Sequence, residues 1–292
     1  KVGLNGKTAA KTVCSTVMTT DQEWMSHLQD TLIPEFLEKY GHPRHVNWDY
    51  EAPVTTSELA CFCARCLASF QAAFPEIDAE VTPEKIQQQY APQWTAFMNQ
   101  RMAAIAGQFR DALHRHQPGI EFSVYTGYHS DFTKRHYGVD WFLLRDKIDR
   151  AMCGYGRPVD NLEATREAIG GMPFTLGIIA NPYEIEKRTP PTWFRPADLM
   201  RRVSDSTGGV LLYHYSTLDS RSFQSVARVS RAMKDYGPYF VAHDVSRRAE
   251  VSIPGWSDAE REVLAGADGT LLVVLMNTSR NAKPYDVQLP AG

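Results

Sequence analysis

The chain has 292 residues and carries 31 Lys and Arg side chains against 34 Asp and Glu side chains, so its formal net charge is −3. This length allows two ordinary domains or one large barrel with an appendage, and an apolar share of 43% is ample for a hydrophobic core. The mixed charge gives no electrostatic footprint for nucleic acid, the apolar runs fall far short of the ~20 residues that span a bilayer, and an aromatic share of 11% excludes a disordered chain.

Short apolar runs alternate with amphipathic stretches, which is typical of βα units around a parallel sheet. The predicted strands are Thr12–Met18, His45–Glu51, Glu121–Thr126, Arg150–Tyr155, Phe174–Ile179 and Val210–Tyr215. The predicted helices are Asp21–Tyr40, Ser57–Phe74, Pro83–His116, Gly138–Lys147, Leu162–Ile169, Pro196–Ser204 and Ser220–Tyr236. No glycine-rich turn follows a strand, so the α/β pattern favours a (β/α)₈ TIM barrel over a nucleotide-binding sheet.

The composition changes after Pro238, where short strand-like runs are joined by Gly, Pro and Asp turns. These runs are Tyr239–Val245, Ala249–Ile253 and Thr270–Met276. We therefore predict a barrel domain over residues 1–237 and a small β domain over 238–292, the start of a β-sandwich-like domain. Because the sequence begins without Met and ends in a strand-like run, we expect a piece of a longer polypeptide that holds the third to eighth barrel strands and lacks the first two βα units.

Four of the five cysteines have the spacing of a metal site. Cys61, Cys63 and Cys66 form a C-x-C-x-x-C motif at the head of a predicted helix, and Cys14 lies upstream beside the first predicted strand. Four thiolates match the tetrahedral preference of Zn²⁺ and leave no open position for water, so the predicted zinc site is structural. Arg65 is expected to offset part of the thiolate charge. A Cys63/Cys66 redox pair and ordinary buried or disulfide-bonded cysteines are the alternatives, and Cys153 is expected to serve packing.

Carboxylates follow two of the predicted strands. Asp49 and Glu51 are two residues apart and therefore share a face at the end of their strand, where barrel enzymes place functional side chains. Glycoside hydrolysis needs two carboxylates across the scissile bond, and Glu51 is the candidate acid/base. The candidate partner is Glu184, with Glu186 and Asp160 as weaker choices. The alternative for Asp49 and Glu51 is an acidic pair on a surface loop.

Aromatic, histidine and amide side chains also gather at the predicted strand ends. Sugar rings stack on aromatic faces, and their hydroxyls bond phenols, imidazoles and amides. Any one of these residues is more often core than ligand, but their recurrence after several strands favours a carbohydrate site. The candidates are Trp48, Tyr50, Tyr125, Tyr128, His129, Tyr155, Asn181, Tyr183, Tyr213, His214 and Tyr215.

The run from Asp49-Tyr50-Glu51, through ten residues, to Cys61-Phe-Cys63-Ala-Arg-Cys66 and Phe70 resembles glycoside hydrolase family 42, the zinc-containing β-galactosidases, over roughly Val13 to Tyr125. The resemblance implies that Glu51 is the acid/base at the end of the fourth barrel strand and that Cys14, Cys61, Cys63 and Cys66 hold structural Zn²⁺. It also implies a retaining mechanism with a second glutamate as nucleophile.

Two positions depart from the family pattern. The family has Asn immediately before the acid/base, where this chain has Tyr50, with Asp49 one position earlier. The family nucleophile ends the seventh strand, where this chain has Ile178-Ile179-Ala180-Asn181 and Glu184 only later. Asp49 is expected to orient Glu51 or bind a sugar hydroxyl.

The sequence thus predicts a glycosidase, with a catalytically inactive carbohydrate-binding barrel as the alternative and a zinc-organised interaction or redox protein as the third hypothesis. The expected partners are an oligosaccharide, polysaccharide or glycoside substrate and further copies of the chain, with neither nucleic acid nor membrane. Free thiols in a zinc site favour a reducing compartment such as the cytoplasm, with the periplasm as the alternative in a bacterium.

Overall fold

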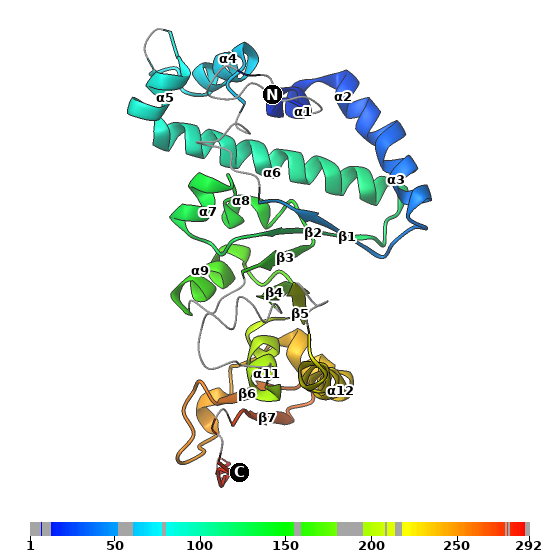
Figure 1. The fold of residues 1–292 in the computed structure, drawn as a ribbon, viewed down its shortest axis with the longest axis vertical. Helices are drawn as coiled ribbons and strands as arrows, with labels where there is room; N and C mark the ends of the chain where they lie inside the picture. Colours follow the sequence, from blue (N-terminus) through cyan, green and yellow to red (C-terminus); the bar gives the residue numbers. More distant parts are fainter. Residues whose placement is uncertain are drawn as a thin grey trace. The chain divides into compact units, whose positions relative to one another are not determined.

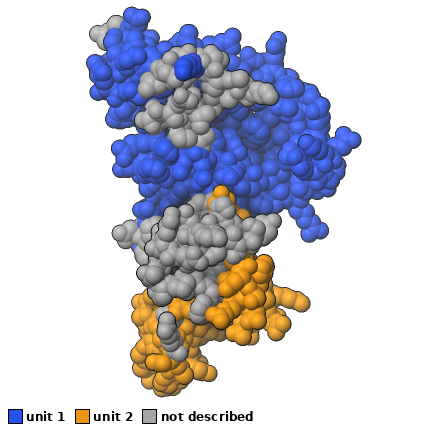
Figure 2. All heavy atoms as spheres, viewed as in Figure 1, with its two compact units in different colours: residues 1–153, 157–172 blue, residues 154–156, 173–292 orange. Residues whose placement is uncertain are grey.

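A computed structural model describes residues 7, 13–51, 61–77, 80–154, 159–179, 195–207, 209–213, 218–277, 279 and 281–289. The chain divides into two compact units, residues 1–153 with 157–172 and residues 154–156 with 173–292 (Figure 2). In each unit parallel strands alternate with helices, as in part of a TIM-like barrel (Figure 1). No helix among the described residues is both long and apolar enough to cross a bilayer.

The first unit is built on three neighbouring parallel strands. Register partners are His45 with Glu121 between β1 and β2, and Ser123 with Arg150 between β2 and β3. Its elements are α1 (Ser15–Thr20), α2 (Gln22–His27), the π-helical turn η1 (Leu28–Leu32), α3 (Ile33–Lys39), β1 (His45–Asp49), α4 (Ala64–Ala73), α5 (Pro83–Gln89), α6 (Ala91–His116), β2 (Glu121–Thr126), α7 (Asp131–His136), α8 (Trp141–Leu144), β3 (Arg150–Cys153) and α9 (Val159–Ile169).

The long helix α6 packs on one face of this sheet. The rings of Trp48 on β1 and Phe109 on α6 lie 5.5 Å apart. The predicted single helix Pro83–His116 is instead two helices, α5 and α6, with non-helical backbone at Tyr90. Pro92 explains the break, since its ring excludes a helical carbonyl four residues earlier and it has no N–H to donate.

The predicted strand Thr12–Met18 is wrong, because the chain is helical over Ser15–Thr20. β-branched residues favoured a strand there, but the Thr19 and Thr20 hydroxyls donate to the carbonyls of Ser15 (3.0 Å) and Thr16 (2.8 Å) within the helix. Contacts with α4 and α6 then outweigh the local propensity.

The second unit contains the parallel pair β4 and β5, the helices α11 and α12, and an antiparallel hairpin. Val229 and Phe240 of α12 share one buried cluster with Ile178 of β4 and Leu264 of β6, so the hairpin packs onto the helices. The elements are β4 (Phe174–Ile179), α11 (Pro196–Asp205), β5 (Val210–Tyr213), α12 (Ser220–Ala242), the 3₁₀ turn η3 (Arg248–Glu250), β6 (Arg261–Ala265) and β7 (Leu271–Leu275).

The tail differs from its predicted pattern in two places. Tyr239–Val245 is not a strand: α12 bends at Tyr236 and continues through Pro238 to Ala242, because proline is tolerated in the first turn after a bend. Ala249–Ile253 forms η3 and a single bridge from Ser252 to Gln288. The strand β7 matches its prediction, β6 was not predicted, and the domain boundary at residue 237 and the β-sandwich stay predictions.

Candidate functional site

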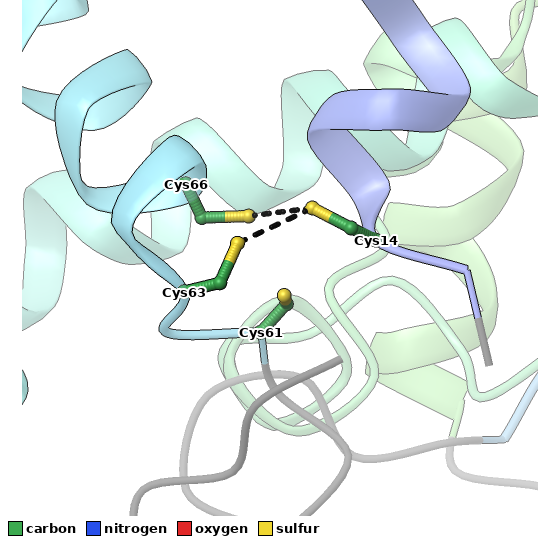
Figure 3. A group of neighbouring side chains, drawn as sticks. All are labelled: Cys14, Cys61, Cys63 and Cys66. Carbon is green, nitrogen blue, oxygen red and sulfur yellow. Dashed lines mark hydrogen bonds between the residues drawn. The ribbon is translucent and has the colours of Figure 1, made fainter. Parts of the chain in front are cut away.

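Four cysteine side chains converge from two separate segments of the first unit. Cys14 precedes α1, whereas Cys61, Cys63 and Cys66 lie before and within the first turn of α4 (Figure 3). The Cys14 sulfur lies 3.3 Å from the Cys66 sulfur and 3.5 Å from the Cys63 sulfur, and all four sulfurs lie within 4.8 Å of one another. The predicted cysteine set is therefore gathered at one point.

The arrangement fits a tetrahedral metal ion. Sulfurs bonded at ~2.3 Å to Zn²⁺ stand ~3.8 Å apart at the corners of a tetrahedron, close to the spacing of these four. None of the four is in a disulfide, and Cys61 and Cys66 are buried. Four soft donors, two of them buried, are suited to Zn²⁺ and leave no open coordination position, so the set could hold a structural ion.

The surroundings of the cluster act on its thiols in opposite directions. Cys63 occupies the N-cap position of α4, where the helix dipole stabilises negative charge, and the Thr16 hydroxyl donates to the Cys66 sulfur over 3.2 Å. Hydrogen bonds from Cys61 and Cys66 lower the pKa of Cys14. Hydrogen bonds with Cys14 and Cys61, together with burial, raise the pKa of Cys66. A bound cation would stabilise the deprotonated form of all four thiols, so that each could bind it as a thiolate.

Arg101 supplies the positive charge beside the cluster. This α6 side chain donates to the hydroxyls of Thr19 and Ser69, and so joins α1 to α4. Burial lowers its pKa, and the charges of Cys66 and Cys14 raise it. Arg65 is exposed, and its expected role in offsetting part of the thiolate charge stays a prediction. Sequence reasoning missed Arg101 because nothing local marks an arginine within a long helix as the neighbour of a distant motif.

The cluster is packed together with the end of β1. Phe62, between two of the cysteines, stacks on Trp94 of α6 with ring centres 5.0 Å apart. Cys61, Cys66 and Trp94 belong to one buried cluster, and Tyr50 packs against it. The residue immediately before Glu51 is thus held by the same core that holds the cysteines.

The face of the sheet opposite α6 carries the polar side chains. Along β1, Asn47 and Asp49 alternate with the half-buried Val46 and Trp48. On the same face, the Ser123 hydroxyl donates to Asn47 Oδ1 over 2.8 Å.

Glu51 lies directly after β1, at the C-terminal end of this polar face. Tyr50 extends the pairing by donating its N–H to the Tyr125 carbonyl over 2.9 Å. The Glu51 side chain is exposed among the described residues, but nearby protein atoms partly shield it from water, and this desolvation, with the charge of Asp49 in addition, raises its pKa. A carboxyl group with a raised pKa next to a second carboxylate is a common arrangement for a general acid.

The aromatic candidates divide between the two faces. Trp48 and Tyr50 are 5.0 Å apart, and their contacts with α6 and the cysteine core give both a packing role. Tyr125 is the register partner of Asp49 and so shares its face, but it is buried, as is Tyr128. His129 is partly buried against Phe142, and burial lowers its pKa.

Other candidates lie elsewhere in the chain. Tyr213 belongs to the second unit and is 44% exposed. Asp160 belongs to α9, but its side chain is not described. Outside the described residues lie Tyr155, Asn181, Tyr183, Glu184, Glu186, His214 and Tyr215.

Tyr137, which sequence reasoning did not select, lies near Glu51. Burial and the charge of Glu51 raise the pKa of its hydroxyl. Its ring packs at the end of β2, where a Cβ on Gly127 would stand 3.6 Å from it. The sequence around Tyr137 does not predict where its ring lies, because that position depends on how α7 packs against Gly127.

No family model matches the sequence, and neither does any curated protein. In fold, the chain is similar to the β-galactosidase from Rahnella sp. R3, with 14% identity and a TM-score of 0.53 over 83% of this chain and 43% of that one. It is also similar to a catalytic mutant of Gan42B, a GH42 β-galactosidase from G. stearothermophilus, with 15% identity and a TM-score of 0.54 over 84% and 44%.

The β-galactosidase from Bacillus circulans sp. alkalophilus gives 13% identity and a TM-score of 0.51 over 80% and 42%. The chain therefore spans less than half the length of each of these proteins. At such identities the likeness establishes a glycosidase-like fold, part of a TIM-like barrel.

Proposed function

We propose that this chain is the greater part of the catalytic barrel of a glycoside hydrolase, with Glu51 as general acid/base and a structural Zn²⁺ on Cys14, Cys61, Cys63 and Cys66. The observation that carries the proposal is the position of Glu51. It follows a strand of a glycosidase-like fold, beside Asp49, and the residue before it packs on the core that gathers the four thiols.

The chemistry assigned to Glu51 is proton transfer. Its raised pKa keeps more of the carboxyl group protonated, so that it donates a proton to the departing glycosidic oxygen. The resulting carboxylate then accepts a proton from the attacking water. Asp49 holds the pKa of Glu51 up through its charge, and Glu184 is proposed as the nucleophile of a retaining, β-galactosidase-like reaction.

The zinc ion would contribute stability and take no part in the reaction. Four thiolates fill its coordination shell, so its role is to join the segment before α1 to the head of α4. This junction packs against Tyr50, which holds the end of β1 in place.

The test is Glu51→Gln in the intact protein. Glutamine keeps the size of the side chain but has no proton to transfer, so hydrolysis of lactose should fall ~10²–10⁴-fold. Hydrolysis of p-nitrophenyl β-galactoside should fall less, since nitrophenolate departs without protonation. Glu35→Gln, an exposed glutamate of α3, is the matched control. Unchanged turnover of lactose by Glu51→Gln would contradict the proposal.

A barrel that binds carbohydrate without cleaving it is the second candidate, and one observation favours it. The position before Glu51, which holds Asn in family 42, is Tyr50, whose side chain packs on the cysteine core. Wild-type protein that binds galactosides but turns over neither lactose nor the nitrophenyl glycoside would decide for this alternative.

A further inference from the structure

A groove lies in the first unit between α7 and the junction of α5 with α6. Its volume is about 550 Å³, within the range of ligand sites. Ile86 and Trp94 line it from the core, each only 1% exposed, while Gln87 and Thr95 contribute an amide and a hydroxyl. Figure 1 shows α7 beside the first half of α6, so the groove is formed by helices outside the sheet.

One wall of the groove is an exposed aromatic surface. Phe132 is 58% exposed, although a phenyl ring of its size is usually buried. It stacks on His136, with ring centres 4.8 Å apart and planes 20° from parallel. Both rings line the groove, and Arg135 lies between them in the sequence. Flat ring faces beside amide, hydroxyl and imidazole groups suit a ligand that has both C–H faces and hydroxyls.

The aromatic surface continues toward Glu51. Tyr137 contacts Phe132 and His136, with ring centres 5.9 Å and 4.8 Å away. Tyr137 also packs at Gly127, just beyond β2, the strand paired with β1. Burial and, in addition, the charge of Glu51 raise the pKa of the Tyr137 hydroxyl. A series of rings therefore leads from the groove to the end of β2, beside the strand that precedes Glu51.

We propose that this groove binds the non-reacting sugar units of an extended glycan whose scissile bond lies at Glu51, with Phe132 as the stacking platform. The inference rests on the proposed function and deepens it, because it assigns the substrate to oligosaccharides or polysaccharides instead of disaccharides. Remote binding of this kind also stabilises the transition state at the reacting bond.

The experiment compares short and long ligands in the intact protein. Calorimetry measures the affinity of β-1,4-linked galacto-, gluco-, manno- and xylotetraose and of their monosaccharides. Kinetics measures turnover of p-nitrophenyl β-galactoside. The variants are Phe132→Ala and the control Phe223→Ala, which removes a phenyl group of similar exposure, 54%, from α12 in the second unit.

At least one tetraose should bind at least tenfold more tightly than its monosaccharide. Phe132→Ala should lower the affinity for that tetraose about tenfold. Phe223→Ala should leave both this affinity and the turnover of the nitrophenyl glycoside unchanged. The groove assignment is overturned if no tetraose outbinds its monosaccharide or if Phe132→Ala binds like wild type, even where turnover is normal. Tetraose affinity that depends on Phe132 in a protein without turnover would uphold the groove and reject the hydrolase.

Discussion

Different interactions hold the segments together within each of the two units. In the first, four thiols from the segment before α1 and the head of α4 meet beside Arg101. In the second, Arg201 of α11 lies 2.8 Å from both Asp205 and Glu262 of β6, and the two carboxylates are almost fully buried. The ion pairs form from the chain's own opposite charges, whereas four thiolates repel until a cation neutralises them. With the proposed zinc ion, the unit with the candidate acid would depend on a metal, whereas the described residues of the other unit are joined by ion pairs.

The largest expected effect is loss of the metal. Structural zinc sites bind with about 10–16 kcal/mol, so chelation or Cys66→Ser should unfold α1 and α4 and release about one zinc per chain. Hydrogen exchange should rise in these helices and stay unchanged in β6 and β7. Cys153→Ala, a cysteine outside the cluster, should keep its metal. Purified protein that holds no metal and still protects α1 and α4 from exchange would contradict this.

The second-largest effect is expected at the buried ion pairs of the second unit. Arg201→Met leaves Asp205 and Glu262 as buried carboxylates without their shared partner and should cost about 3–5 kcal/mol. Denaturant unfolding followed by hydrogen exchange should locate the loss at α11 and β6, with zinc content unchanged. Arg231→Met removes an exposed arginine of α12 and should cost almost nothing. Equal stability of the two variants would show that the ion pairs contribute nothing.

A smaller effect is expected at Arg101. Arg101→Met removes hydrogen bonds to Thr19 and Ser69 and the cation beside the thiolates, so it should cost about 2 kcal/mol and speed zinc loss to a chelator. Arg101→Lys keeps the charge and should recover part of the metal retention. Arg115→Met, on an exposed site of the same helix, is the control. If Arg101→Met loses zinc at the wild-type rate, Arg101 does not stabilise the metal site.

The smallest expected effect concerns pH. The charge of Asp49 contributes to the raised pKa of Glu51, so Asp49→Asn should lower that pKa. Because the protonated acid is the active form, the alkaline limb of kcat/KM for lactose should move to lower pH, while the fold and zinc content stay unchanged. A limb that moves upward, or not at all, would show that Asp49 does not act on Glu51 through its charge.

Several elements followed from local sequence alone. Glu121–Thr126 and Phe174–Ile179 are strands with the predicted bounds, because short runs rich in β-branched and aromatic residues between turn signals favour a sheet. The cysteine set was also predictable, since C-x-C-x-x-C places three sulfurs within six residues at the head of a helix and one distant thiol completes the four.

Other features depended on the folded chain. Thr12–Met18 and Tyr239–Val245 have strand-like composition, yet the structure has helix at Ser15–Thr20 and as far as Ala242, because contacts with neighbouring helices outweigh small propensity differences. Alternation along β1 separates Trp48 from Asp49 but does not say which face meets α6.

What the sequence determined was the chemistry available: four soft ligands and an acidic pair at a strand end. What only the tertiary structure decided was which groups meet. Arg101 beside the thiols and Tyr137 at the end of β2 are brought there by packing between separate segments of the chain, and no pattern within one segment encodes such a meeting.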